Sequence, residues 1–331
     1  MKGYSTYLAG TGYALIFGFS FLVTKTALAA LDPFELLALR FTLAALAMTV
    51  LVALGIIKVN FGADLRRYLA AACLFQPLFY FTCETYGIRE SASSTAGIVL
   101  GALPAAVAVL GALTLKERLS LRQAAALGLS IVGVAVIVLW GGVRDGRTGT
   151  LRGVLFLFGA VASATFFNVL SRRASSVFSP ATTTFAMMWS GALGFGAIAL
   201  VRGIQGGRLV GTQGLFVRAA PAWFGILYLG LLSSVLAFFF VNFTLSRLKA
   251  SQSVVFANLA TVVSVAAGVL IRGENFGIAQ LVGSVMIVLG VWGTNAAGRA
   301  DERARRGSRK LAADAERERA AAVKSGGGAD S

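Results

Sequence analysis

The chain has no histidine and only two cysteines, Cys73 and Cys83, among its 331 residues. Without histidine it lacks the commonest metal ligand and the side chain that most often shuttles protons near neutral pH. Both cysteines lie in one apolar stretch, which fits neither a disulfide framework nor the spacing of a metal-binding motif. The sequence therefore predicts no metal and no cofactor.

Charge is also scarce, because only 13% of the residues are Asp, Glu, Lys or Arg. A soluble chain carries roughly 25% charged residues. Hydrophobic residues make up 57% of the chain, and the mean hydropathy is +0.78. A soluble core cannot enclose this much apolar surface, so these values predict an integral membrane protein.

Runs of about 18–25 residues with little charge are long enough to cross a bilayer as helices. The sequence contains ten such runs, and charged or turn-forming residues separate them. We predict an all-α membrane protein with ten transmembrane helices at 7–30, 34–57, 68–88, 92–115, 123–140, 153–171, 179–201, 222–245, 250–271 and 277–297.

An internal repeat divides these spans into two groups of five. Residues 99–119 align with residues 256–276, each being an apolar run that leads into a charged turn centred on a Glu. At a constant separation of 157 residues, the repeat pairs Gly111 with Gly268, Leu113 with Leu270 and Glu117 with Glu274. Because five is odd, the second copy enters the membrane the other way up, which predicts an inverted repeat with the transport path near spans 4 and 9.

The expected domain boundaries follow from this repeat. The first five-helix repeat covers 1–140, a connecting loop covers 141–152, and the second repeat covers 153–298. A charged tail at 299–331 is expected to be disordered, because its composition offers little apolar surface to bury.

Basic residues indicate the orientation, since Lys and Arg are enriched in cytoplasmic loops. The side that holds both termini carries 20 Lys and Arg residues, including nine in the tail, and the opposite side carries eight. We therefore expect both termini in the cytoplasm and the protein in the plasma membrane.

The sequence resembles the drug/metabolite transporter superfamily, and within it the ten-span carriers with two EamA-type domains. The resemblance covers about 1–298 and rests on DPFELLALRFTLAALA, SASSTAGIVLGALPAAVAVLGALTLKERLS and LYLGLLSSVLAFFFVNFTLSRLKASQSVVFANLATVVSVAAGVLIRGENF. It implies export of a small metabolite, such as an amino acid or a drug-like amphiphile. The second half lacks the proline of span 4, because Thr261 stands at the position that matches Pro104.

Apart from Glu35 in the first turn of span 2, three fully charged side chains lie inside the predicted spans: Lys25, Arg40 and Glu84. Such groups are costly in hydrocarbon unless they face protein or water and have a partner. One interpretation is a buried Arg40–Glu84 ion pair, with Lys25 reaching outward to the interface. The alternative is a charged patch on the substrate path that binds a carboxylate or phosphate, with Glu84 available for an amino group.

Other polar or aromatic side chains near the middle of spans are weaker candidates for the substrate path. Most such groups face neighbouring helices and serve packing. The candidates are Gln76, Tyr80, Asn168, Trp189, Asn242 and Asn258.

Span 4 is a candidate hinge. Gly97 and Gly101 form a GxxxG pair, which favours close helix packing. Pro104 follows within one turn and removes a backbone hydrogen bond, so the helix can bend there.

A carrier is the leading functional class. Drug efflux by proton antiport is an alternative, with Glu84 as the embedded carboxylate, and facilitated export or exchange is equally compatible with the sequence. A membrane enzyme is the competing class, although no nucleophile with a visible base occurs. The expected partners are a small-molecule substrate, the lipid bilayer and, for antiport, protons. We expect a monomer or weak homodimer and no nucleic-acid binding.

Overall fold

The structure, a computed structural model, describes most of the chain between residues 2 and 300. The described residues are 2–60, 73–103, 105–107, 110, 120–140, 150–174, 178–205, 219–245, 247, 250–294, 296–298 and 300. The charged tail beyond residue 300 and the proposed hinge residue Pro104 lie outside them.

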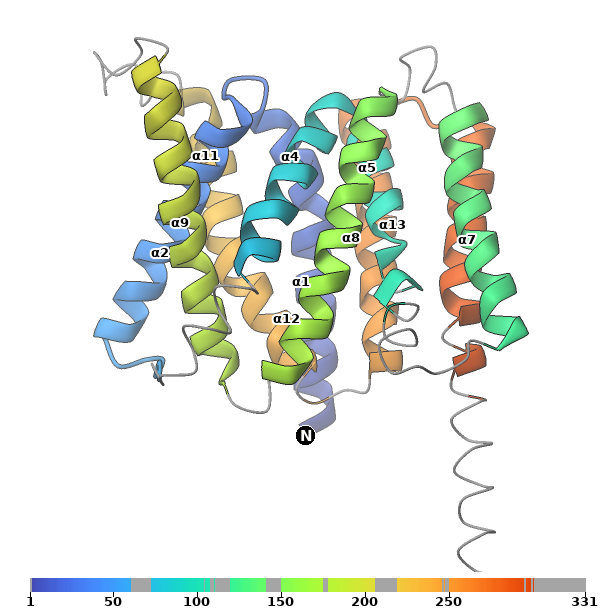
Figure 1. Cartoon of the computed structure of the whole chain (residues 1–331), viewed down its shortest axis with the longest axis horizontal. Coiled ribbons are helices and arrows are strands. Elements are labelled where there is room, and N and C mark those ends of the chain that lie inside the picture. Colours follow the sequence, from blue (N-terminus) through green and yellow to red (C-terminus); the bar gives the residue numbers. More distant parts are fainter. Residues whose placement is uncertain are drawn as a thin grey trace, which may run out of the picture.

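The described residues form helices and no strands, and the helices stand side by side as a bundle (Figure 1). Every predicted span overlaps one or more described helices. The first half contains α1 (Lys2–Ala27), α2 (Pro33–Ala53), η1 (Leu74–Phe79), α4 (Tyr80–Glu90), α5 (Ser93–Leu100) and α7 (Leu121–Trp140). The second half contains α8 (Leu151–Ala174), α9 (Pro180–Gln205), η3 (Ala220–Ala222), α11 (Trp223–Leu227), η4 (Tyr228–Ala237), α12 (Phe238–Leu245), α13 (Ala250–Arg272) and a C-terminal helix, Ile278–Gly298.

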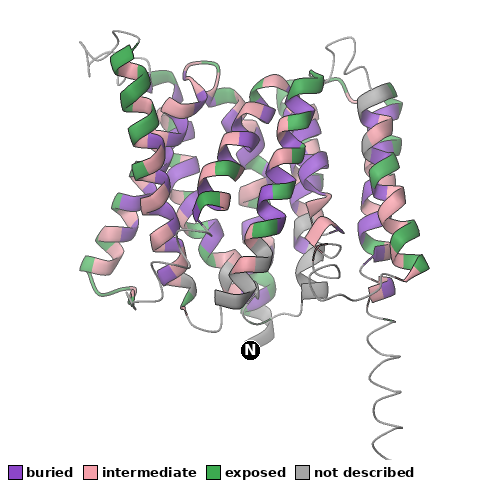
Figure 2. Ribbon diagram, viewed as in Figure 1, coloured by how far each residue is buried: buried purple, intermediate pink, exposed green. Residues whose placement is uncertain are grey.

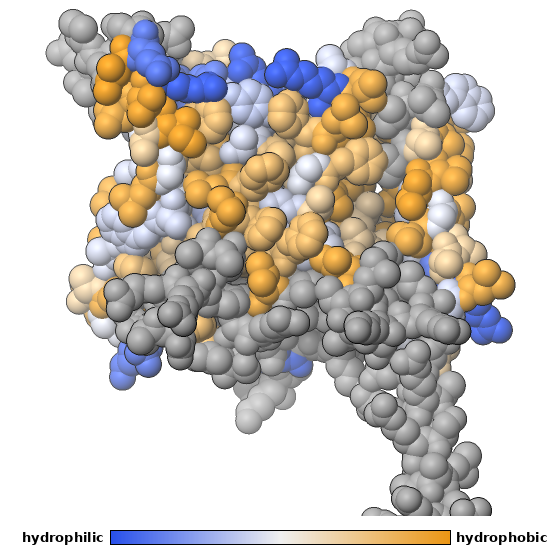
Figure 3. All heavy atoms as spheres, in the orientation of Figure 1, coloured by the Kyte–Doolittle hydropathy of each residue, from blue (hydrophilic) through white to orange (hydrophobic). Residues whose placement is uncertain are grey.

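Five helical segments are long and apolar enough to cross a bilayer: Ser5–Ala27, Pro33–Ala53, Ala181–Gln205, Ala220–Val241 and Ile278–Gly298. Large apolar side chains such as Leu121, Phe224 and Leu270 are exposed, and Figure 2 shows exposed residues in green along the helices. The space-filling view shows apolar side chains across the middle and hydrophilic ones at the upper end (Figure 3). This distribution is the one expected of a protein surrounded by lipid, because apolar side chains replace water-exposed polar ones there.

The first connection shows how local sequence sets a helix boundary. Asp32 caps α2 by accepting a hydrogen bond from the backbone N–H of Phe34 at 3.2 Å. Glu35 reaches back to the backbone N–H of Asp32, also at 3.2 Å, which completes a capping box. Pro33 occupies the first helical position, where its missing N–H costs nothing.

Helices of the two halves pack against each other throughout the bundle. The closest partners are α2 with α9, α1 with α13, and α4 with α8. At one end of the bundle α7 packs on the C-terminal helix, where Ser130 donates a hydrogen bond to the Ile287 carbonyl at 3.3 Å (Figure 1). The core is therefore formed between the halves rather than inside each one.

Two segments depart from α-helical geometry at matching places in the two halves. η4 is π-helical, whereas η1 is a kink at which two helical pieces meet, and the repeat separation of 157 residues places η1 on 231–236, inside η4. Within η1, Gln76 has φ −141° and ψ 116°, so the helix is broken there, and Ser163 of α8 donates to the Phe75 carbonyl at 2.7 Å. π-helical turns like that of η4 occur frequently at functional sites.

Spans 4 and 9 are in direct contact along 93–101, the region near which we expected the transport path. Thr261 of α13 donates to the Gly97 carbonyl at 3.3 Å, and Ser264 donates to the Ser93 carbonyl at 3.1 Å. A Cβ atom on Gly101 would lie 2.6 Å from Thr261 Oγ1, and one on Gly97 would overlap Ser264. The two glycines therefore let the backbones meet, and the space between α5 and α13 is filled at this level.

We expect Gly97→Ala to lower the stability of the protein by about 1–3 kcal/mol, because the new methyl group must push α5 away from α13. The midpoint of thermal unfolding of the detergent-purified protein measures this. Gly128→Ala is the matched control, since nothing lies within 4 Å of a Cβ there and helix propensity favours alanine. Equal midpoints for Gly97→Ala and wild type would contradict the close packing.

Candidate functional site

Arg40 lies deep between the halves and is the centre of the candidate site. It projects from α2 and is only 3% exposed. Its Nε donates to Ser234 Oγ at 2.9 Å, and its Nη2 donates to Ser233 Oγ at 3.2 Å. Both serines belong to η4 of the second half and are completely buried. The guanidinium carbon lies 4.4 Å from the centre of the Phe81 ring, a cation–π contact.

Glu84 and Tyr80 form the second part of the site. They lie one turn apart on α4, and the Tyr80 hydroxyl donates to Glu84 Oε1 at 2.8 Å. Glu84 is 6% exposed. The Glu84 carboxylate and the Arg40 guanidinium attract each other through space, but no hydrogen bond or ion pair joins them among the described contacts. The Arg40–Glu84 ion pair is therefore a wrong expectation, because Arg40 turns toward the serines of η4.

The other predicted path residues are distributed over several helices. Gln76 is buried at the break in η1 that leads into α4. Trp189 of α9 donates its indole N–H to Thr49 Oγ1 of α2 at 3.0 Å, which makes it part of the α2–α9 contact. Asn258 of α13 is half-buried, and the side chains of Asn168 and Asn242 lie outside the described residues.

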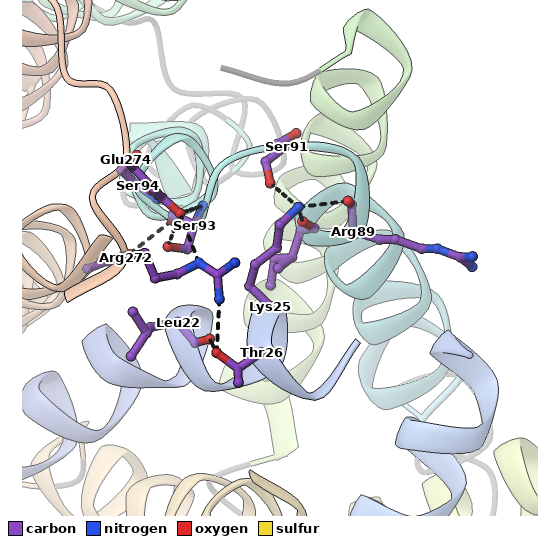
Figure 4. Close-up of polar contacts among 11 residues, drawn as sticks. Leu22, Lys25, Thr26, Arg89, Ser91, Ser93, Ser94, Arg272 and Glu274 are labelled. Carbon is purple, nitrogen blue, oxygen red and sulfur yellow. Dashed lines mark hydrogen bonds and ion pairs between the residues drawn. The ribbon is translucent and has the colours of Figure 1, made fainter. Parts of the chain in front are cut away.

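Lys25 lies apart from the Arg40 site, at the end of α1. Its Nζ donates to three backbone carbonyls at the end of α4: Ile88 at 2.9 Å, and Arg89 and Ser91 at 2.8 Å (Figure 4). These carbonyls lie at the negative end of the α4 dipole, where a cation is stabilising. Lys25 therefore holds the turn between α4 and α5 instead of reaching outward into the interface.

Glu274 binds the other side of the same turn. Its Oε1 accepts from the Ser93 backbone N–H at 2.9 Å and from the Ser93 hydroxyl at 2.7 Å, and its Oε2 accepts from the Ser94 backbone N–H at 2.9 Å (Figure 4). Ala92, at the N-cap of α5, makes no side-chain cap bond. A carboxylate from the second half thus caps a helix of the first half.

Two arginines of the second half also contact the first half at this end. Arg202 lies 3.5 Å from Asp32, which also pairs with Arg89 at 3.4 Å. Arg272 lies 3.8 Å from Glu274 and donates to Thr26 at 3.0 Å. The described connections at this end are therefore tied together by contacts between the halves.

Sequence reasoning missed the serines that contact the charged groups. Ser93 with Ser94, and Ser233 with Ser234, are consecutive pairs, the first at the polar start of span 4 and the second inside an apolar run. Their pairing offered a weak signal, but the partner of each pair lies 180 residues or more away in the sequence. Only the arrangement of the halves reveals these contacts.

Comparison with known proteins places this bundle in a family. The sequence profile of the EamA-like transporter family matches twice, over residues 4–139 and 151–296. The chain belongs to the EamA-like transporter family. The two matches lie on either side of the 141–149 connection, and the EamA family assignment makes the chain a multi-pass membrane protein with a small-molecule substrate.

Individual EamA relatives agree with this assignment. The uncharacterized transporter YcxC of Bacillus subtilis is 37% identical over 290 residues, which covers 87% of this chain and 92% of the relative. A protein named a probable amino-acid metabolite efflux pump, from Salmonella typhimurium, is 24% identical over 84% of this chain and 90% of its own length. A crystal structure that is 19% identical superposes with a TM-score of 0.59 over 88% of this chain and 98% of that chain, so the two share a fold.

The Glu274 contacts predict a dependence of stability on pH. Burial would raise the pKa of this carboxyl, but the hydrogen bonds from Ser93 and Ser94 stabilise its charged form and leave the pKa below the ordinary value. A lowered pKa in the folded state stabilises the protein above the pH at which an unfolded Glu titrates, and this contribution is lost as the pH falls through the folded pKa.

We expect Glu274→Gln to lower the midpoint of thermal unfolding near pH 7, by the equivalent of a lost helix cap of about 0.5–2 kcal/mol. The difference from wild type should shrink as the pH falls below about 4. Glu35→Gln is the control, because glutamine also completes a capping box. A Glu274→Gln difference that is constant from pH 7 to pH 3 would contradict a charged carboxylate cap.

Proposed function

We propose that this EamA protein exports a small metabolite, amino-acid-like or amphiphilic, across the plasma membrane by alternating access. The observation that supports this best is the pair of buried, opposite charges between the halves, Arg40 and Glu84. Charged groups are retained inside membrane spans mainly on substrate or ion pathways. The similarity to a probable amino-acid metabolite efflux pump points to the same substrate class.

The separation of the two charges fits a substrate that itself carries both signs. Arg40 offers N–H donors to a carboxylate, and Glu84 offers acceptor oxygens to an amino group. The rings of Phe41, Phe81 and Trp189 belong to one apolar cluster beside Arg40, which suits an apolar side chain or the body of an amphiphile. We assign Gln76 and Tyr80 to the same path, with Lys25 at its outer end.

For the scaffold we propose ten transmembrane helices in two inverted repeats, 1–140 and 153–298. The contacts between helices support this, because they occur in exchanged pairs. Packing of α1 on α13 is matched by α8 on α5, and packing of α4 on α8 is matched by η4 on α1. A two-fold axis in the membrane plane, relating the first half to the second, would generate this pattern.

We propose that both termini are cytoplasmic, as the excess of basic residues indicates. The end that holds Lys25, Asp32 and Glu274 then faces outward, and its contacts between halves correspond to a closed outer gate. Export would require Glu274 to leave Ser93 and Ser94 so that this end opens. The same movement would separate α5 from α13, with Gly101 and Pro104 as the bending point.

A counterflow assay in liposomes tests the functional class. A carrier exchanges labelled for unlabelled substrate and saturates, whereas a channel shows flux that does not saturate. A membrane enzyme converts the compound, which chromatography of the liposome contents detects. Drug efflux by proton antiport, the second candidate, would make the exchange depend on a pH gradient.

We expect Glu84→Gln to reduce counterflow of an apolar amino acid at least tenfold while insertion into the membrane stays normal, because the neutral amide cannot hold a substrate ammonium group. Transport by purified, reconstituted protein measures the effect. Glu90→Gln is the control, because Glu90 pairs with the exposed Arg152 at 3.7 Å at the surface. Unchanged flux in Glu84→Gln would reject a functional role for this carboxylate.

A further inference from the structure

Among the described contacts, no carboxylate touches Arg40 directly to neutralise its charge. Its two described hydrogen bonds go to Ser233 and Ser234, and its face rests on Phe81. Serine hydroxyls accept hydrogen bonds but carry no charge, so they orient a guanidinium without neutralising it. A structural arginine in so buried a place is normally paired with a carboxylate.

The geometry of the guanidinium decides which part of it is available. Nε and Nη2 form one edge of the planar group, and this edge is the one that the two serines occupy. The five N–H donors are arranged so that Nη1 and the second hydrogen of Nη2 form another edge, which matches the two oxygens of a carboxylate. Protein contacts fix one edge and one face of the Arg40 guanidinium. The direction of the other edge, formed by Nη1 and the second hydrogen of Nη2, is therefore fixed as well.

Two consecutive residues of a π-helical turn contact the one guanidinium. Side chains on an α-helix diverge by about 100° per residue, which separates neighbours. A π-helical turn is wider, because its hydrogen bonds run from residue i to i+5, so consecutive residues diverge less. η4 covers residues 228–237 and carries Ser233 and Ser234 near its middle.

We propose that Ser233 and Ser234 are positioning residues that hold Arg40 so that its remaining edge binds the carboxylate of the substrate. This inference rests on the proposed transport function and deepens it: the serine pair makes the carrier select substrates with a free carboxylate. Neither serine contacts the substrate in this arrangement, since each acts through Arg40.

The test compares matched ligands that differ only at the carboxylate. L-Leucine and L-phenylalanine are compared with L-leucinamide and L-phenylalaninamide, using counterflow in liposomes and thermal stabilisation of the purified protein. For the wild type, the acids should be favoured over the amides at least tenfold in kcat/KM. In Ser233→Ala and Ser234→Ala, KM for the acids should rise several-fold at nearly constant kcat, and KM for the amides should stay unchanged.

Two further sets of variants distinguish a role in positioning Arg40 from a general effect on protein stability: the double serine variant, and the serine substitutions combined with Arg40→Lys. Ser233→Ala/Ser234→Ala should lose the preference for acids. In an Arg40→Lys background, the serine substitutions should cause no further loss, because residues that act as a unit are not additive. Ser190→Ala is the matched control, because the Ser190 hydroxyl bonds to the Met187 carbonyl of its own helix at 3.0 Å.

Three results would overturn the inference. The first is a wild type that does not prefer acids over amides. The second is a parallel loss of acid transport, amide transport and unfolding midpoint in the serine variants, and the third is a serine effect that persists in full in Arg40→Lys. Saturable exchange of amides and acids alike leaves the transport function intact and rejects only the role of the serines. Absence of saturable exchange for every compound in the counterflow panel rejects the transport function itself.

Discussion

Arg40 carries a positive charge into the interior between the two halves, where only the protein itself can compensate the loss of water. Moving an ion out of water costs several kcal/mol even after the surroundings relax. The protein meets this cost with hydroxyl groups from η4, an aromatic face from α4 and the more distant charge of Glu84. These groups come from both halves, so the relative placement of α2, α4 and η4 depends on how this one charge is accommodated.

The same constraint explains the turn between α4 and α5. A helix that ends near the membrane surface leaves backbone carbonyls and N–H groups without helical partners. Lys25 satisfies the carbonyls at the end of α4, and Glu274 satisfies the N–H groups at the start of α5. The two side chains come from α1 and from the connection after α13. Glu274 therefore also ties the second half to the first, and separating the halves must expose the N–H groups at the start of α5.

Hydropathy alone located the helices, because the requirement for about 20 apolar residues is strong and local. The rule that buried charges are expensive singled out Arg40 and Glu84, which are both buried and interact through space. Of the two interpretations of these charges, the direct Arg40–Glu84 ion pair is not formed, because Arg40 bonds instead to two consecutive serines of η4 that hydropathy does not single out. Lys25 also lies in an apolar run of the sequence. It stands two residues before the end of α1, however, where it donates to backbone carbonyls at the end of α4.

The repeat is most informative where its two copies differ. The buried charges Arg40 and Glu84 belong to the first half, and the hydroxyls that hold Arg40 belong to the second. The kinked segment η1 and the π-helical segment η4 occupy corresponding positions, but η1 leads into Tyr80 and Glu84 while η4 presents Ser233 and Ser234. A movement of one half against the other would change the hold on Arg40 and leave Tyr80 and Glu84 together on α4. For the zwitterionic substrate that we propose, such a movement would weaken one of its two contacts while retaining the other. An asymmetric pair of repeats could in this way bind a substrate on one side of the membrane and release it on the other.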